Sequence, residues 1–185
     1  MKKIHVPKIF SLTFLLLTAA IWTPAADSPR VNRSALVTVE KSLDDRITRL
    51  WDDGPVALLG YTRGIYLEGY GAVFTAEVNL AAGGATLMHP VLNKEDKDQH
   101  RKKKLDRLPQ LKAAMKQALM ASAASLDPVP ADDQVVIAIY LARYPWEDAT
   151  GIPAQLTAQA TKKRLLEIQR AGGAGLEQAV TVKEN

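Results

Sequence analysis

The stretch that decides the fold is Tyr61–Leu80, which reads YTRGIYLEGYGAVFTAEVNL. Aromatic and β-branched residues favour strands, and single glycines inside such a run are typical of turns or bulges. From Phe74 onward apolar and polar residues alternate, and we expect the polar ones to lie on an exposed face: Thr75, Glu77 and Asn79. The reversal lies at Arg63–Gly64 or at Glu68–Gly71, so a hairpin and a three-stranded meander both remain open.

Helices are predicted on both sides of this stretch. Before it, apolar residues recur at spacings of three and four and predict an amphipathic helix over residues 34–51, with Ser34 as its N-cap. After it, residues 93–125 read as a helical region that is highly charged up to Arg107 and amphipathic beyond Pro109. Because proline is best tolerated in the first turn of a helix, we expect a break or kink near Leu108.

The last third of the chain predicts a second strand pair. Residues 135–144 (VVIAIYLARY) are apolar on both faces, as in a central buried strand, and residues 154–161 alternate. A short helix is predicted over residues 162–170, and residues 173–185 are interpreted as a C-terminal tail. The fold class is therefore α+β: a single two-layer domain over residues 34–172, with a mainly antiparallel sheet of about four strands in two pairs and two to three helices on one face.

The N-terminus has the layout of a secretory signal peptide. Three lysines precede the uncharged run Ile9–Trp22, and small residues follow it, so we interpret residues 1–25 as a signal peptide and 26–33 as a flexible lead. The apolar run is shorter than the roughly 20 residues of a membrane-spanning helix. We therefore expect a periplasmic or secreted protein.

Composition excludes several classes of function. The chain has no cysteine, which rules out disulfides, thiol nucleophiles, zinc–thiolate sites and a lipid-anchored cysteine. Removal of residues 1–25, which contain three lysines and no acidic residue, lowers the formal charge from +4 to +1. The basic character thus belongs largely to the predicted signal peptide, and we expect no nucleic-acid partner.

Neither a nucleotide site nor a metal site is predicted. The Gly69-Tyr-Gly71 element lacks the third glycine of a dinucleotide fingerprint, because Phe74 occupies that position and a strand follows. His89 and His100, with the acidic residues between them, match neither a helical ligand pair nor a calcium loop. We expect no cofactor.

Carboxylates near aromatic residues are the candidates for catalysis. Glu68 with Glu77, or Glu147 with Asp148, would suit acid–base hydrolysis if the pair were held at the correct separation. Glu68 and Glu147 are the catalytic candidates of this alternative, a small carbohydrate- or peptidoglycan-directed hydrolase.

Two segments are candidates for binding. Lys102, Lys103 and Lys104 form the centre of a basic run, which predicts salt-sensitive docking on an anionic envelope component and peripheral membrane association. The loop at 144–153 carries Tyr144 and Trp146 beside carboxylates and prolines, a composition that favours recognition. The alternative is that Trp146 caps the core at the end of a strand.

The leading interpretation is a non-enzymatic, exported bacterial envelope protein that acts as a binding or assembly module. Its predicted contact surfaces are the basic helix, the exposed strand face with Glu77, and the Trp146 loop. The expected partner is an envelope protein or an anionic envelope component, and homo-oligomerisation is plausible because an open sheet offers an edge for pairing. A structural subunit of an envelope complex is the third interpretation, and it predicts a large exposed apolar patch.

Overall fold

The computed structural model of the chain describes residues 31–52, 56–81, 83 and 92–185. The predicted signal peptide, 1–25, and residues 26–30 of the predicted lead lie outside these residues. The described elements, in chain order, are α1 (Arg33–Thr48), β1 (Ala57–Leu58), β2 (Arg63–Leu67), β3 (Gly71–Asn79), α2 (Lys94–Ser125), β4 (Gln134–Leu141), β5 (Gln155–Thr161), α3 (Lys162–Arg170), α4 (Leu176–Ala179) and β6 (Val182–Glu184).

The strands form one mixed six-stranded sheet in the order β1-β3-β4-β5-β6, and β2 pairs with β3 on the same edge as β1. All pairings are antiparallel except that of β3 with β4. The α+β class is confirmed. The structure differs in detail from the expected four strands and mainly antiparallel pattern, because it has two further short strands and one parallel pair at its centre.

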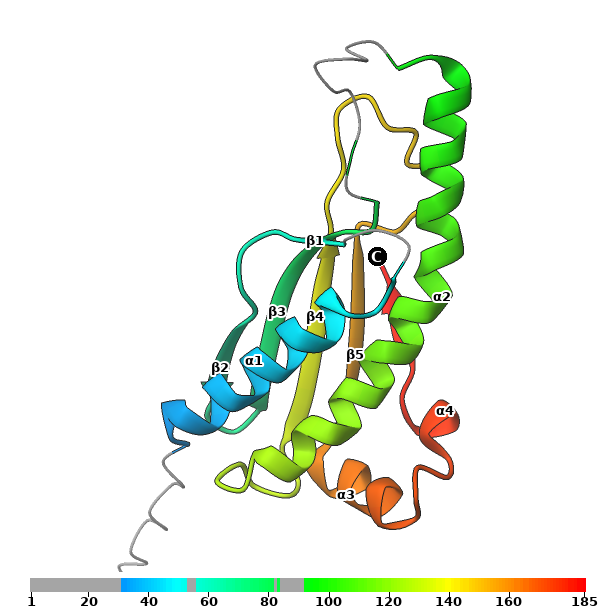
Figure 1. Cartoon of the computed structure of the whole chain (residues 1–185). Coiled ribbons are helices and arrows are strands. Elements are labelled where there is room, and N and C mark those ends of the chain that lie inside the picture. Colours follow the sequence, from blue (N-terminus) through cyan, green and yellow to red (C-terminus); the bar gives the residue numbers. More distant parts are fainter. Residues whose placement is uncertain (1–30, 53–55, 82, 84–91) are drawn as a thin grey trace, which may run out of the picture.

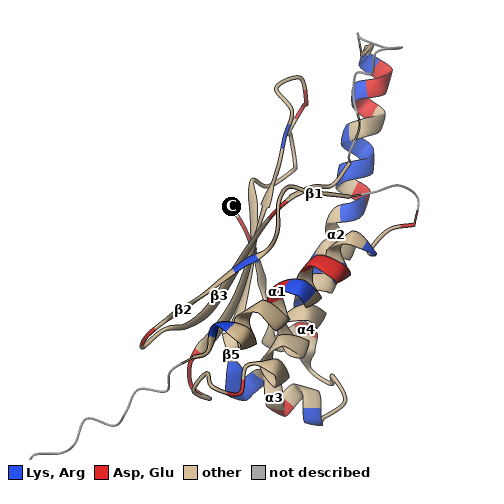
Figure 2. Cartoon of the chain, turned by 60° about the vertical axis from the view of Figure 1, so that its left-hand side comes forward, with Lys and Arg blue, Asp and Glu red and all other residues tan. Residues whose placement is uncertain are grey.

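The helices cover one face of this sheet. Figures 1 and 2 show α1 and α2 crossing the same side, with α3 and α4 near its lower end. α1 packs over β1 and β2, and α2 packs over β4 and β5. The core lies between the layers, and its largest fully buried side chains include Phe74, Leu111, Met115, Leu119, Ile137 and Leu156.

The Tyr61–Leu80 stretch forms a hairpin and not a three-stranded meander. β2 and β3 pair from Arg63 with Thr75 to Leu67 with Gly71, and Tyr70 N donates to Leu67 O at 3.0 Å across the turn. Gly69 has a φ of +74°, a conformation that the third position of a type II turn requires. The turn lies at Glu68–Tyr70.

The parallel pairing of β3 and β4 follows from the length of α2. A helix of 32 residues returns the chain along the whole sheet, so β4 starts at the same end as β3. The apolar run Val135–Ile139 within β4 fits the central position of this strand in the sheet. The local sequence pattern predicts pairing only between strands that follow each other through short turns, so this crossover was not predicted.

Of the expected break or kink near Leu108, the break is wrong, because α2 runs without interruption through Pro109. Figure 1 shows that the axis of α2 bends along its length. Pro109 is exposed while Leu108 and Leu111 are buried, so the ring projects on the solvent side of the helix. Water can satisfy the carbonyl that loses its partner there. At α1, the cap is Asn32 and not Ser34: the Asn32 side chain accepts a hydrogen bond from Ser34 N at 3.1 Å.

Residues 173–185, interpreted as a tail, contain α4 and β6. β6 adds to the sheet beside β5, and Leu176 and Val180 are buried in the core. Lys162, at the start of α3, donates from Nζ to the carbonyl oxygens of Leu126, Asp127 and Val129. The ammonium thereby satisfies backbone acceptors where α2 ends.

Gly71 marks the closest approach within the sheet. A Cβ at this position would lie 1.9 Å from Gln134 O, and its φ is +139°. We expect Gly71→Ala to lower the free energy of unfolding by about 3 kcal/mol or more, because both the clash and the backbone strain would have to relax. Urea denaturation followed by circular dichroism measures the loss.

Gly69→Ala is the matched control. Gly69 also has a positive φ, but nothing lies within 4 Å of a Cβ built on it. We expect a loss of about 1 kcal/mol, from backbone strain alone. Equal losses in the two variants would contradict the close contact between β3 and β4.

Candidate functional site

The first candidate site is the face of the sheet that no described helix covers. Side chains alternate along a strand, and the even-numbered residues of β3 point into the core. The opposite side, which we name the open face, is therefore formed by the odd-numbered residues of β2, β3 and β5, the even-numbered residues of β4, and Lys183 of β6. Figure 2 shows the sheet nearly edge-on, with the helices on one side only.

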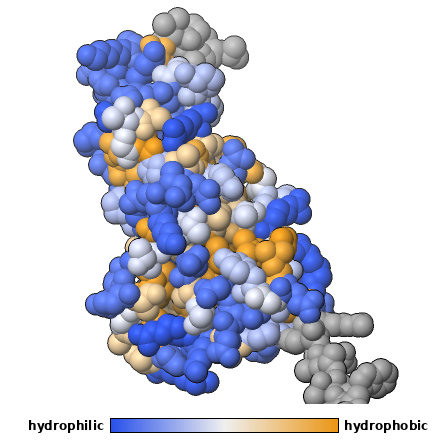
Figure 3. Space-filling view, turned by 180° about the vertical axis from the view of Figure 1, so that it is seen from behind, coloured by the Kyte–Doolittle hydropathy of each residue, from blue (hydrophilic) through white to orange (hydrophobic). Residues whose placement is uncertain are grey.

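The open face is apolar over β2, β3 and β4. Ile65, Val73 and Val136 lie in one row across these strands by register, but Val73 is half-buried and Val136 is only 5% exposed. Ile65 is 51% exposed, Leu67 44% and Tyr140 50%. Figure 3, which views the molecule from behind, shows hydrophobic residues gathered at mid-height on the side where β2 lies. Large exposed apolar patches often mark protein interaction surfaces. The exposed apolar side chains of this face are therefore a candidate docking site.

The rest of the open face is polar and carries few charges. Over β5 the row continues into Gln159, and the next row ends at Thr157 and Lys183. Glu77, one of the predicted contact residues, is exposed and pairs by register with Tyr140. Asn79 has the parity of this face but is not exposed, contrary to expectation: it is 2% exposed, and its side chain accepts a hydrogen bond from Ala81 N.

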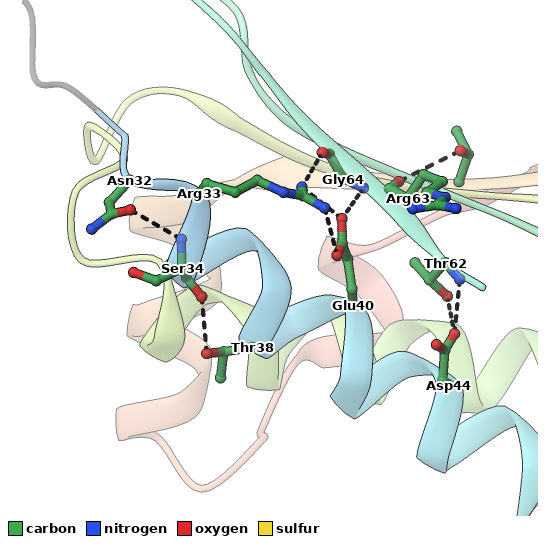
Figure 4. A network of polar contacts seen from close by, with 10 residues as sticks. Asn32, Arg33, Ser34, Thr38, Glu40, Asp44, Thr62, Arg63 and Gly64 are labelled. Carbon is green, nitrogen blue, oxygen red and sulfur yellow. Dashed lines mark hydrogen bonds and ion pairs between the residues drawn. The ribbon is translucent and has the colours of Figure 1, made fainter.

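Side chains of α1 cap the β2 edge of the sheet. Asp44 accepts hydrogen bonds from Thr62 N at 2.9 Å, and Glu40 accepts one from Gly64 N at 2.6 Å (Figure 4). Arg33 donates to Gly64 O at 2.9 Å and forms an ion pair with Glu40. Asp44 and Glu40 lie one helical turn apart, so their spacing matches alternate residues of the edge strand. The capped groups are unavailable to another strand at this position.

The second candidate site is an arm that extends past the sheet. α2 spans about 48 Å for its 32 residues. β4, with 8 residues, spans only about 27 Å. The first part of α2, residues 94–107, therefore projects beyond the sheet, and the loop 142–154 between β4 and β5 lies against it (Figure 1).

A buried ion pair joins the two parts of the arm. Lys104 Nζ lies 2.5 Å from Glu147 Oε2, and the two side chains are 2% and 3% exposed. Lys104 also donates to Ala142 O at 3.0 Å, and His100 Nε2 lies 3.1 Å from Glu147 Oε1. Burial lowers the pKa of His100, although its hydrogen bond to Glu147 opposes the shift. We therefore assign a neutral ring that donates from Nε2.

This geometry separates the three lysines of the predicted basic surface. Lys102 is exposed and forms an ion pair with Asp106 on the next helical turn, and Lys103 is half-buried. Lys104 points into the arm and cannot contact a partner. Arg107, further along the basic run, is also buried and donates to Leu80 O at 2.6 Å. Lys104 and Arg107 of the basic run therefore stabilise the fold and do not belong to an exposed basic surface.

Tyr144 and Trp146 stack on each other over the arm, with ring centroids 5.4 Å apart and planes 13° apart. The His100 ring meets Trp146 edge-on at 4.9 Å. Tyr144 is 38% exposed and Trp146 is half-buried, and neither belongs to the hydrophobic core cluster. Trp146 therefore packs within the arm and not on the main core.

The structure does not bring the predicted catalytic carboxylates together. Glu68 lies in the turn before β3, and Glu77 lies near the other end of that strand, on the order of 20 Å away. Glu147 is buried in its ion pair. Its neighbour Asp148 is 54% exposed and accepts hydrogen bonds from Thr150 N and Oγ1, which lower the pKa of Asp148. Neither pairing forms an open two-carboxylate site.

Within the described residues, no group of three or more histidine and acidic side chains is placed to hold a metal ion. His89 lies outside these residues. No helix among them is long and apolar enough to cross a membrane. Comparisons with protein-family models, with curated proteins and with solved structures found no match to this chain.

Sequence reasoning missed the apolar part of the open face. In the stretch Arg63–Leu67 apolar residues occupy both parities, because Tyr66 contributes to the core side while Ile65 and Leu67 point outward. The period-two signal is therefore hidden. The available signal was the pair Ile65 and Leu67, two apolar residues at alternate positions of a strand that glycines flank.

Removal of Glu147 should leave a buried ammonium without its counter-ion. We expect Glu147→Ala to lower the free energy of unfolding by about 3–5 kcal/mol, and Lys104→Met combined with Glu147→Leu to cost much less, because that double variant buries no charge. Chemical denaturation measures both.

Lys102→Met is the control. It removes a lysine whose side chain is 78% exposed and should change stability by less than about 0.5 kcal/mol. A Glu147→Ala loss no larger than that of Lys102→Met would contradict the buried pair.

The lowered pKa of His100 predicts a loss of stability in mild acid. Above the unfolded-state pKa of about 6.5, the ring is neutral in both states. As the pH falls through that value, the unfolded chain binds a proton that the folded chain resists, so the folded state loses stability until the lower folded pKa is passed. The free energy of unfolding of the wild type should therefore fall relative to that of His100→Gln as the pH is lowered from about 7.5 to 5. A difference in free energy of unfolding that stays constant or grows over this pH range would refute the prediction.

Proposed function

We propose that the protein is an exported, non-enzymatic binding or assembly module of the bacterial cell envelope that docks a protein partner on its open face. The observation that carries the proposal is the one-sided sheet: helices cover one face, and the other bears the exposed side chains of Ile65, Leu67 and Tyr140. Burial of such a side chain in an interface contributes about 1.5–3 kcal/mol.

The mode of docking follows from the state of the sheet edge. Edge addition of a strand at β2 would have to displace Glu40, Asp44 and Arg33 from the backbone of residues 62–64. Each of these contacts is a hydrogen bond to a charged group, a class that contributes about 1.5–3 kcal/mol. A partner that packs on the open face displaces none of them. We therefore expect side-chain packing on the face and not strand addition at this edge.

The chemistry of the face favours a protein over an anionic polymer or lipid. Its cations, Arg63 and Lys183, are accompanied by Glu77, and its centre is apolar. An anionic surface would be attracted by clustered lysines. The exposed cations of the arm, such as Lys102, remain the proposed contact for an anionic envelope component. That contact does not involve Lys104.

Export and the periplasmic location rest on the basic head, apolar run and small residues at the N-terminus. Non-enzymatic action is supported by the separation of Glu68 from Glu77 and by the burial of Glu147. The third interpretation, a structural subunit, shares the exposed apolar patch with this proposal.

Site-specific photo-cross-linking in the producing cells tests the proposal. A photoreactive amino acid at position 65 or 67 should yield covalent adducts with protein, because both side chains are exposed on the open face. The control position is Thr38, which is exposed on α1 in the opposite layer and should yield none. Adducts at 38 with none at 65 and 67 would refute docking on the open face.

A further inference from the structure

We infer that the partner on the open face is a different protein and that it binds through one amphipathic helix, which lies along β2 and places an acidic side chain beside Arg63. The bound helix forms a third layer on the uncovered side of the sheet. This inference rests on the proposed function and states the chemistry of its partner.

The exposed apolar side chains follow one margin of the sheet. Seven large apolar or aromatic side chains are exposed in the part of the chain that the structure describes, and five of them lie between residues 59 and 70: Leu59, Tyr61, Ile65, Leu67 and Tyr70. The other two are Tyr140 on β4 and Tyr144 on the arm. Next to β2 the face is less accessible, because Val73 is half-buried and Val136 is only 5% exposed. The apolar surface available to a partner is therefore narrow and follows β2.

Arg63 adds a positive charge to this margin. It is exposed, and it lies between Tyr61 and Ile65 at alternate positions of the chain. Among the described residues, no ion pair involves Arg63. Glu77 is only its diagonal neighbour, because the register partner of Arg63 is two residues before Glu77 on β3. An apolar margin with this cation is complementary to an apolar segment that carries a carboxylate.

The acidic residues of α1 do not neutralise this cation. Glu40 pairs with Arg33 and accepts a hydrogen bond from Gly64 N, and Asp44 accepts hydrogen bonds from Thr62 N and Oγ1. These contacts hold the start of β2 in place before a partner arrives. A rigid surface loses less conformational entropy on binding, which favours affinity.

The capped edge also selects the conformation of the bound segment. An extended segment that lies over the side chains of β2 leaves its own backbone N–H and C=O groups without partners, unless it adds to the strand edge. At Gly64 that edge is occupied, because Glu40 accepts from the amide and Arg33 donates to the carbonyl. A helix needs no such partner, because its backbone hydrogen bonds are internal. The bound segment is therefore a helix.

The helix comes from a different protein. The described helices of this chain bury their apolar residues in their own core, as Leu43 of α1, Leu119 of α2 and Leu165 of α3 show. None of these helices has an apolar face left for the sheet of another copy. The partner must supply a helix whose apolar side is not already covered.

The length of the margin sets the length of this helix. Tyr61 and Leu67 are about 20 Å apart at the rise of a strand. A helix of about 13 residues spans the same distance. Its apolar side chains recur every three or four residues toward Ile65 and Leu67, and its carboxylate faces Arg63. A helix about 10 Å wide covers roughly 200 Å² of projected area over this length. Stable complexes bury about 800 Å² on each partner, so the inferred complex is transient.

Mapping of photo-cross-links in the producing cells tests the inference, because a covalent adduct traps a transient complex. A photoreactive amino acid is placed at position 61 or at position 67, both exposed, and the attached peptide is identified by mass spectrometry. A helix along β2 should give two attachment sites about 13 residues apart in one partner protein. An extended segment would give sites about six residues apart.

Charge reversal provides the second readout. Arg63→Glu should lower the adduct yield at position 67 by on the order of 10-fold, because it opposes two carboxylates. Arg46→Glu is the matched control: it makes the same change of charge at an exposed residue of α1, in the opposite layer, and should leave the yield unchanged. Circular dichroism should show both variants folded, since neither side chain forms a hydrogen bond or ion pair with a described residue.

The outcomes separate this inference from the proposed function. Attachment sites about six residues apart in one partner, or a yield that Arg63→Glu and Arg46→Glu lower equally, overturn the acidic helix and leave docking on the open face intact. Adducts at 61 and 67 that contain only a second copy of this chain also overturn the inference alone. Adducts with lipid only, or no adduct at 61, 65 or 67, overturn both.

Discussion

The rest of the structure depends on the parallel pairing of β3 with β4. At its start, Gly71 approaches Gln134 so closely that no side chain fits between the strands. A parallel neighbour requires a crossover, and α2 provides it along one face of the sheet. Because α1 packs on the same side, that face receives both long helices. The open face and the overhanging end of α2 are both consequences of this one connection.

Another chain could bind to a sheet with one open face at an edge or on that face. In this protein the β2 edge is capped, whereas the open face is exposed. At the β2 edge, the carboxylates of Glu40 and Asp44 take the place of a neighbouring strand. Capping of this kind prevents uncontrolled strand addition. On the surface, Ile65 and Leu67 remain exposed. Closing the edge while leaving the face apolar favours packing with a defined geometry over open-ended assembly.

The arm has a different physical basis. It lies beyond the hydrophobic core, so its two parts are held by polar contacts: Lys104 with Glu147, His100 with Glu147, and Arg101 with Thr150. A buried ion pair adds little net stability, but it specifies a single arrangement because separation leaves either charge unpaired. We propose that this specificity positions Tyr144 and Trp146 for contact.

The sequence by itself determined the α+β class, the strand at β3, and the adjacent β5 and α3, and it offered Glu68–Gly71 as one of two places for the turn. All of these depend on local periodicity or on turn residues, which act over a few positions. Only the tertiary structure decided the parallel pairing of β3 and β4, the burial of Lys104 and the exposure of Ile65. Their partners lie far away in the chain: Glu147 is 43 residues from Lys104. A lysine in a basic run and an isoleucine in a strand look alike whether they face solvent or protein, because local pattern does not record which layer covers them.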